Sequence, residues 1–170
     1  MTERLPKSER HESMRGYFMY ELHNQMRKDP SIWVVSIDLG YGALDKIKRD
    51  FPERFINTGA SEQSALGIAV GLALEGKKPF VYTISSFYMR AAETISLYVN
   101  QEEIPVRMIG AGRDDDYKHD GRSHHAGVTQ SFIASMENIN TYYPNDFDAA
   151  ARMCEMMVKD NNPAFISLRR

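Results

Sequence analysis

The stretch ERFINTGASEQSALGIAVGLALEGKKPFVYTI, residues 53–84, decides how this chain folds. It begins with a short apolar run over residues 54–58 and ends with another over residues 79–83. Between them lies a segment of small and apolar residues that opens on Ser61, a suitable N-cap residue, and stops before Gly76, a typical helix terminator. We therefore predict a strand, a helix and a second strand, the unit from which parallel sheets are built.

The alternation of strands and helices continues outward on both sides of this stretch. Before it, the apolar spacing over residues 10–27 predicts an amphipathic helix, and the unbroken apolar run over 32–37 predicts a buried strand. After it, the predicted order is a helix over 85–100, a strand over 105–109, a helix over 128–136, a strand over 139–143, a helix over 145–159 and a strand over 163–168. This order predicts an α/β fold with a parallel sheet of about five or six strands and helices on both faces.

The composition is that of one ordinary domain. The chain has 170 residues, 42% of them hydrophobic and 26% charged, so we treat it as a single domain with residues 1–9 as a flexible N-terminal tail. The net charge of -2 excludes bulk electrostatic capture of nucleic acid or acidic lipid as the main role. The single cysteine, Cys154, excludes an intramolecular disulfide and a cysteine-rich zinc site.

The sequence shows neither a signal peptide nor a membrane-spanning segment. Residues 1–14 are polar and lack the apolar core of a signal peptide. The longest apolar stretch, residues 66–74, is far shorter than the roughly 20 residues that a membrane-spanning helix needs. We therefore expect a cytoplasmic protein with neither a membrane nor a nucleic acid as its partner.

The first candidate functional residue is Glu62, at the start of the central helix. Ligands of open α/β sheets bind beyond the carboxyl ends of the strands, and Glu62 lies in such a position. It is either a functional carboxylate or an acidic residue that only stabilises the helix N-terminus. The same helix carries Gly67 and Gly71. Because glycine lowers helix stability, these two residues indicate close approach by another chain or tight packing on the sheet of this one.

Two further segments follow predicted strands. Residues 83–90 form a strand-to-helix turn in which Phe87 either provides an apolar wall for a flat heterocycle or faces the core beside a solvated Arg90. Residues 114–125 form a long loop with three histidines and four aspartates. These residues lack the spacing of a metal site, so we predict no metal ligands here. Contacts to a substrate and a plain solvated loop remain the alternatives.

The motifs of this chain resemble those of the transketolase family. Residues 51–63 and 67–80 resemble the thiamine diphosphate signature of its pyrimidine-binding (Pyr) domain, and the likeness extends from about residue 10 to residue 170. Three shorter segments resemble family motifs: Ser-Ile-Asp-Leu at 36–39, Asp-Gly-Arg-Ser-His at 120–124, and the closing Leu-Arg-Arg at 168–170. The resemblance implies the Pyr-domain fold for this chain.

The resemblance also implies how the cofactor, thiamine diphosphate, would be held. Glu62 matches the glutamate that hydrogen-bonds N1′ of the aminopyrimidine and favours the tautomer whose nitrogen removes the C2 proton of the thiazolium. The cofactor then serves as an electron sink. Phe87 matches an aromatic residue that packs on the pyrimidine, and Ile84 and Asp38 match its further cofactor contacts. Ile84 stands where the family often has phenylalanine.

The substrate residues implied by the resemblance lie in the loop and at the end of the sequence. His124, which we also count as catalytic, and Asp120 match residues that contact substrate hydroxyls or the carbonyl, and His125 lies beside them. Arg169 or Arg170 matches an arginine that holds a substrate phosphate. In the loop, Arg-Ser at 122–123 replaces the family's Pro-Thr.

The sequence lacks the Gly-Asp-Gly…Asn motif with which the family binds magnesium and diphosphate. The resemblance therefore implies a split transketolase that transfers a two-carbon ketol unit between sugars or sugar phosphates. This chain would be its Pyr subunit. A separate diphosphate-binding (PP) subunit would supply Mg²⁺ and most diphosphate contacts, in a complex with two copies of each chain.

Two alternatives stay open at this point. The chain could be the Pyr subunit of a thiamine diphosphate-dependent decarboxylase or dehydrogenase, against which His124 favours the transketolase. It could instead be a non-catalytic assembly or regulatory subunit. The joint presence of Glu62, Phe87 and His124 argues against that, because a scaffold needs none of them.

Overall fold

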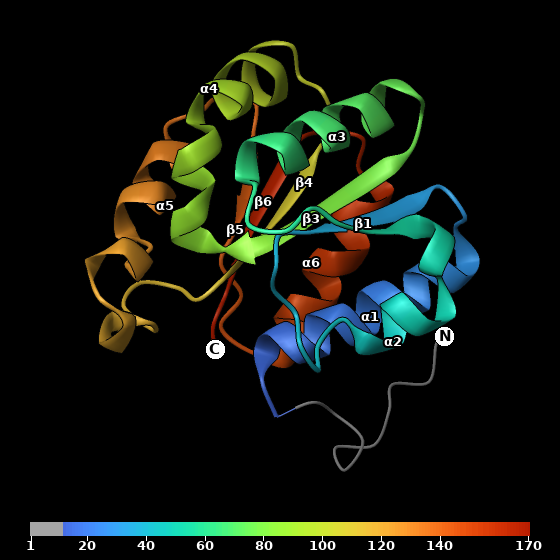
Figure 1. The fold of residues 1–170 in the computed structure, drawn as a ribbon, viewed down its shortest axis with the longest axis horizontal. Coiled ribbons are helices and arrows are strands. Elements are labelled where there is room, and N and C mark those ends of the chain that lie inside the picture. The colour runs from blue at the N-terminus through green and yellow to red at the C-terminus, as the bar shows by residue number, and fades with distance from the viewer. Residues whose placement is uncertain (1–11) are drawn as a thin grey trace.

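The computed structural model describes residues 12–170, in which one six-stranded sheet is packed on both faces by helices (Figure 1). The strand order is β2-β1-β3-β4-β6-β5, and every neighbouring pair is parallel. The strands are β1 Ile32–Ser36, β2 Phe55–Asn57, β3 Lys78–Ile84, β4 Arg107–Ala111, β5 Asn140–Tyr142 and β6 Ala164–Leu168. The predicted α/β class is confirmed, whereas the predicted tail at residues 1–9 lies outside the described part of the chain.

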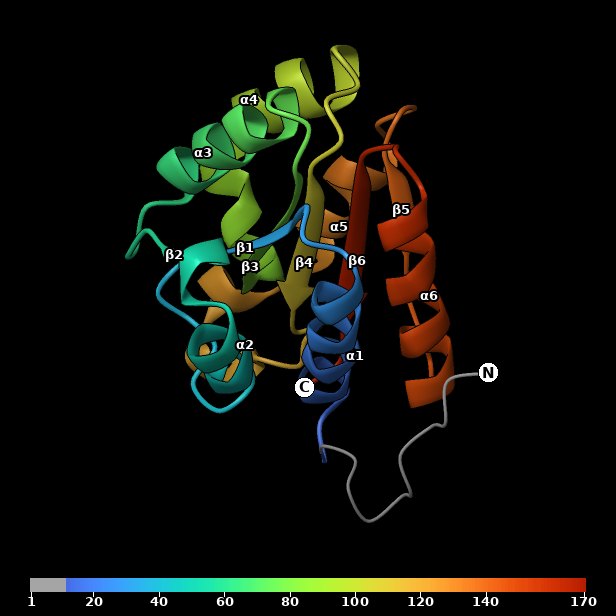
Figure 2. The ribbon, with the colours of Figure 1, turned by 90° about the vertical axis from the view of Figure 1, so that its right-hand side faces the viewer.

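Helices α1, α2 and α6 cover one face of the sheet, and α3, α4 and α5 cover the other; Figure 2 shows α1 and α6 side by side. The bounds of these helices are α1 Met14–Lys28, α2 Asp45–Asp50, α3 Glu62–Leu74, α4 Ala92–Thr94, α5 Gly127–Ala134 and α6 Phe147–Lys159. Successive strand residues point to opposite faces, so Val34 packs in the core under α1 while Val35 packs in the core under α3. Burial on both faces explains why the central strands are continuous apolar runs.

The predicted single helix over 85–100 is wrong. The segment is divided into the 3-10 helix η3 Ser85–Ala91, the short α4, and the π-helix η4 Ile95–Gln101. Ser85 Oγ donates to Gly112 O at 2.6 Å, and Tyr88 Oη donates to Val81 O at 2.8 Å. Residues three apart eclipse in a 3-10 helix, so the tighter winding turns both hydroxyls toward the backbone of β3 and of the segment that ends β4.

Strand β4 begins at Arg107, two residues later than predicted. This arginine is fully buried and donates to the carbonyls of Met157, Pro105 and Asp160 at 2.7–2.8 Å. Burial lowers the pKa of Arg107 to about 10. Its three hydrogen bonds satisfy the carbonyls of the preceding turn and of the end of α6, which makes a charged residue acceptable inside a sheet.

The ends of α3 and α6 test the predicted caps. Gly76 has a φ of 73° and donates to Ala73 O, while Lys77 donates to Leu72 O, so the helix ends in a Schellman motif as glycine there predicts. Ser61 occupies the N-cap position of α3, but its hydroxyl donates to Ser64 Oγ instead of accepting from the helix backbone. Helix α6 is capped by Asp146, whose carboxylate accepts from the backbone of Ala149.

The predicted loop between β4 and α5 is real and contains two short 3-10 turns, η5 Lys118–Asp120 and η6 Arg122–His124. Within residues 12–170, no helix is both long and apolar enough to cross a membrane.

Candidate functional site

A cavity of about 120 Å³ opens beyond the carboxyl ends of β1 and β3. We call it the Glu62 cavity; it is lined by Ile37, Asp38, Leu39, Ala60, Glu62, Thr83, Ile84 and Phe87. Strand β1 lies between β2 and β3, so the chain leaves β1 toward one side and then crosses to the other. Such a reversal is where open α/β sheets bind their ligands. The cavity brings together four residues that the sequence singled out, Asp38, Glu62, Ile84 and Phe87.

Glu62 is the first residue of α3, and its carboxylate lies at the positive end of the helix. Only 7% of the residue is exposed. Arg90 Nη1, from η3, lies 2.6 Å from Glu62 Oε1. The carboxylate is therefore both buried and paired, beyond what the stabilisation of a helix start requires.

Phe87 links the Glu62 cavity to the loop after β4. The guanidinium of Arg90 lies over the Phe87 ring, with Cζ 4.0 Å from the ring centroid. The His124 ring packs edge-on against the same phenylalanine, with the two centroids 5.1 Å apart. Phe87 is half-buried and lines the cavity, so it is not a core side chain, although Arg90 beside it is exposed as that interpretation expected.

The chemistry of this lining fits an aminopyrimidine. Ile84 and Phe87 provide apolar surface for a flat ring, and Glu62 provides a carboxylate for a ring nitrogen or an amino group. The hydroxyl oxygen of Thr83 is buried with no hydrogen-bond partner in the described part of the chain. A buried polar group without a partner costs about 1–3 kcal/mol, so a polar ligand in this cavity would find an acceptor already in place.

Asp38 belongs to two cavities. Besides the Glu62 cavity, it lines a hollow of about 330 Å³ beneath the loop that follows β1, where Tyr41 is fully exposed. Its φ of 46° is unusual for a residue other than glycine, and its backbone donates to Asn57 Oδ1 at 3.2 Å. Backbone of this kind is concentrated at functional sites.

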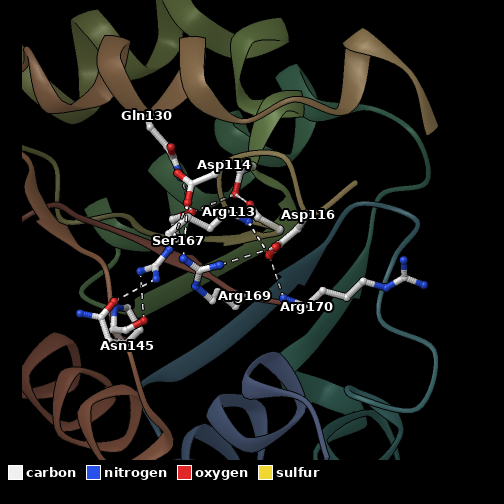
Figure 3. Close-up of polar contacts among 11 residues, drawn as sticks. Arg113, Asp114, Asp116, Gln130, Asn145, Ser167, Arg169 and Arg170 are labelled. Carbon is white, nitrogen blue, oxygen red and sulfur yellow. Dashed lines mark hydrogen bonds and ion pairs between the residues drawn. The ribbon is translucent and has the colours of Figure 1, made fainter. Parts of the chain in front are cut away.

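Four charged residues form a second site beyond the ends of β4 and β6 (Figure 3), and we call them the arginine–aspartate cluster: Arg113, Asp114, Asp116 and Arg169. Arg113 lies two residues after the end of β4 and is 5% exposed. Its guanidinium donates to Pro144 O and Asn145 Oδ1, each at 3.0 Å. Arg113 was not among the residues predicted from the sequence, although its place just after a strand is a signal for a site residue.

The remaining predicted substrate residues are dispersed along the loop and the end of the sequence. Asp120 and His125 are exposed and line neither the Glu62 cavity nor the cavity beside the cluster. Asp120 Oδ2 lies 3.4 Å from His119 Nε2. Arg170 turns its guanidinium away from the cluster, toward His119 Nε2 at 3.1 Å. Only His124 reaches the Glu62 side of the site, through its contact with Phe87.

The glycines of α3 have open space around them. Apart from its chain neighbours and the backbone of the helix itself, a Cβ added to Gly67 or Gly71 would meet no atom of the described chain within 4 Å. Tight packing of these glycines on the sheet is therefore wrong, which leaves the approach of another chain as the open interpretation. Among residues 12–170, no group of three or more His, Cys, Asp or Glu side chains is arranged to hold a metal ion.

The parallel sheet and the cavity at its reversal define a ligand-binding α/β domain. The model of the family described as "Transketolase, pyrimidine binding domain" matches residues 11–170. The chain therefore belongs to the pyrimidine-binding domain family of the thiamine diphosphate-dependent transketolases.

Among curated proteins, the chain is similar to synthases of 1-deoxy-D-xylulose 5-phosphate. The synthase of Fusobacterium nucleatum is 34% identical over 119 residues, which cover 69% of this chain and 20% of that protein. That of Listeria monocytogenes is 32% identical over 146 residues, 85% of this chain and 24% of that protein. The chain thus spans about a fifth to a quarter of the length of these relatives.

Two solved structures are similar over most of this chain. One, described as "Split gene transketolase, inactive beta4 tetramer", has a TM-score of 0.81 and 26% identity, and the match covers 93% of this chain and 52% of that one. Transketolase from Campylobacter jejuni has a TM-score of 0.82 over 92% of this chain and 25% of that one. At 20% identity, this second likeness shows the fold alone.

Proposed function

We propose that this chain is the Pyr subunit of a split, thiamine diphosphate-dependent transketolase-like enzyme. The proposed reaction is the transfer of a two-carbon ketol unit between sugars or sugar phosphates. The observation that carries the proposal is the Glu62 cavity, where a buried carboxylate and an aromatic wall meet at the reversal of the sheet.

Each residue of the cavity has a distinct task in this proposal. Glu62 shares a proton with N1′ of the aminopyrimidine, while Phe87 and Ile84 cover the ring and exclude water. Asp38 holds the loop after β1 against the cofactor. Thiamine diphosphate, when bound, supplies the nucleophilic carbon and the electron sink. His124, packed on Phe87, presents a ring nitrogen to the hydroxyls or carbonyl of the sugar.

The proposal requires a second subunit. The Glu62 cavity, at about 120 Å³, holds one ring of the cofactor, and the sequence lacks the motif for magnesium and diphosphate. A PP subunit would supply that motif, the Mg²⁺ ligands and the opposite wall. Self-association is supported by the similar chain that is described as an inactive beta4 tetramer, whereas a complex with two copies of each of two chains stays a prediction. The substrate roles of Asp120, His125, Arg169 and Arg170 remain predictions.

A second candidate is the reaction for which the curated relatives are named, formation of 1-deoxy-D-xylulose 5-phosphate. The identity of 34% favours it. A decarboxylase or dehydrogenase subunit and a non-catalytic subunit are the remaining alternatives. Identification of the product made by the assembled complex distinguishes these three alternatives from one another and from the proposed ketol transfer.

The first test is calorimetric titration of thiamine diphosphate with Mg²⁺ into this chain, alone and with its PP subunit. We expect binding too weak to measure for the chain alone and saturable binding for the complex, because half of the site lies on the partner. Tight binding by the chain alone would contradict the division of the site between two chains.

A further inference from the structure

The loop that follows β4 places its own carboxylates among the arginines beyond the strand ends (Figure 3). Asp114 Oδ2 lies 3.6 Å from Arg169 Nη2 and 3.9 Å from Arg113 Nε. Asp116 Oδ1 lies 4.0 Å from Arg169 Nη1. Each guanidinium of the arginine–aspartate cluster therefore faces a carboxylate of this chain.

The Asp116 carboxylate is bound by the same kinds of donor that bind a free anion. Its Oδ2 accepts from the backbone N–H of Arg113 at 3.1 Å and from that of Arg170 at 3.0 Å. The side chain is 19% exposed. Backbone N–H groups and a nearby guanidinium are the donors that proteins use for phosphate and carboxylate. Here a side chain of the same chain already occupies them.

Arg113 and the neighbouring Arg170 have further partners besides these carboxylates. The guanidinium of Arg113 donates to Pro144 O and Asn145 Oδ1. That of Arg170 lies over the Tyr117 ring at 5.3 Å and contacts His119.

Beside the cluster lies a cavity of about 460 Å³. Its lining combines Arg113, Asp114 and Arg169 with the neutral side chains of Gln130, Ser131, Ala134, Tyr143 and Asn145. Gln130 Nε2 donates to Ser167 Oγ at 3.0 Å, which fixes one amide at the rim. Neutral amides and hydroxyls suit sugar hydroxyls, which both donate and accept hydrogen bonds.

We propose that Asp114 and Asp116 stand in for a substrate phosphate, so that this site takes a neutral, hydroxyl-bearing sugar and rejects a sugar phosphate. A phosphate entering the cluster meets two carboxylates whose repulsion offsets the attraction of the guanidinium groups. It must also displace Asp116 from two backbone donors. That the ligand is a sugar rests on the proposed function, whereas the rejection of phosphate rests on the cluster alone.

The test is titration of inorganic phosphate into the full chain, followed by the amide NMR shifts of the loop over 112–126. The variant carries Asp114→Asn and Asp116→Asn together, which keeps the shape of both side chains and removes both charges. Asparagine tolerates the φ of 55° at position 114, and it can still accept the backbone hydrogen bonds at position 116. We expect no saturable phosphate binding by the unchanged chain over the concentrations titrated. We expect saturable binding by the variant, with an affinity at least about tenfold above the detection limit that the unchanged chain fails to reach.

The matched control is Asp115→Asn. Asp115 is the middle member of the same aspartate run, but it pairs with Lys118 at 3.6 Å. Asp115→Asn removes one negative charge, as each change of the double variant does, but it removes that charge outside the cluster. We therefore expect no gain of phosphate binding from it. If the double variant does not fold, Asp114→Asn alone serves, since the recorded partners of the Asp114 carboxylate are ion pairs at 3.6 and 3.9 Å.

Three results would overturn the proposal: saturable phosphate binding by the unchanged chain, a folded variant that still fails to bind phosphate, or an equal gain in Asp115→Asn. None of these measurements involves thiamine diphosphate. Failure here is thus distinguishable from failure of the proposed function, which the cofactor titration reports.

Discussion

Glu62 and Arg90 form the contact on which the chemistry of the Glu62 cavity depends. Glu62 is a buried residue with 7% of its surface exposed, and its carboxylate pairs with the Arg90 guanidinium. The same guanidinium also packs on Phe87. In the proposed complex, the pyrimidine must approach the same carboxylate. Arg90 therefore orients Glu62 and competes with the cofactor for it, a role that cannot be derived from the spacing of the two residues in the sequence.

The change Glu62→Gln tests whether the carboxylate is catalytic. Glutamine keeps the shape but cannot share a proton with N1′ in the same way, so we expect about a 10²- to 10⁴-fold loss of C2 proton exchange in the complex. The charge at the helix start contributes only about 0.3–1 kcal/mol, so the melting temperature should change little. The matched control is Glu93→Gln, at the exposed first turn of α4, which should retain both properties. Exchange at the unchanged rate in Glu62→Gln would refute the assignment.

Asp29 predicts how stability depends on pH. Burial alone raises the pKa of Asp29, but hydrogen bonds from Lys78 and Ser31 outweigh it and lower the pKa to about 2. A carboxyl whose pKa is lowered by folding stabilises the fold above its ordinary pKa, and this stability is lost as the pH falls toward 2. We expect Asp29→Asn to lower the free energy of unfolding by up to about 2 kcal/mol at pH 7 and by far less at pH 2. Urea unfolding at both pH values measures this, with Asp115→Asn as the control; an equal loss at both pH values would contradict it.

At the scale of elements, periodicity predicted the order of strands and helices, but side-chain hydrogen bonds decided the bounds. The apolar runs of β1 and β3 were readable because both faces of the sheet are buried. The 3-10 helix η3 is separate from the helical turns that follow it because of Tyr88, whose hydroxyl donates to carbonyls of β3 and β4. Arg107, the first residue of β4, donates to carbonyls 50 and 53 residues away, at the C-terminal end of α6. Neither tertiary contact can be inferred from local sequence.

The same limit applies to the site. Asp38, Glu62, Ile84 and Phe87 were predictable because each follows the end of a strand or carries a family motif, and the fold gathers them in one cavity. The arginine–aspartate cluster was not predictable as a unit, because its two arginines are separated by more than fifty residues of sequence and meet only when β4 and β6 pair.

Tyr88→Phe tests the hydrogen bonds that shape η3. The hydroxyl is buried and donates to Val81 O at 2.8 Å, with Ile109 O at 3.1 Å. Its removal deprives buried carbonyls of their donor, so we expect a loss of about 1–3 kcal/mol in the free energy of unfolding. The same exchange at Tyr98, which is 49% exposed, should change stability by less than about 0.5 kcal/mol. Equal effects in urea unfolding would show that the buried hydroxyl contributes nothing.

At the scale of the whole molecule, the exposed face of α3 is the surface best suited to another chain. Gly67 and Gly71 leave it flat, and Ile68 and Leu74 are exposed on the same helix at 38% and 69%. Small residues allow two backbones to approach closely, which offsets their cost in helix stability. This face supports the proposed association with further subunits.

Gly71→Leu tests that surface. Because a Cβ added at this position meets no atom within 4 Å apart from its chain neighbours and the backbone of its own helix, we expect the unfolding free energy to be unchanged or raised. Assembly, measured by sedimentation velocity with the PP subunit present, should be weakened. Arg152→Leu, an exposed position on α6 at the opposite face, adds the same side chain and should leave assembly intact. Normal assembly of Gly71→Leu would remove α3 from the interface.

One ring, Phe87, is shared by the two halves of the proposed site. His124 packs against this ring and the Arg90 guanidinium lies over it, so a ligand that moved the ring would affect both neighbours. In the proposed complex, cofactor and sugar would then be thermodynamically linked: whichever binds first would change the affinity for the other, and by linkage the factor is the same in either order. Such reciprocity needs no hinge and no moving domain, only a phenylalanine with a neighbour on each side.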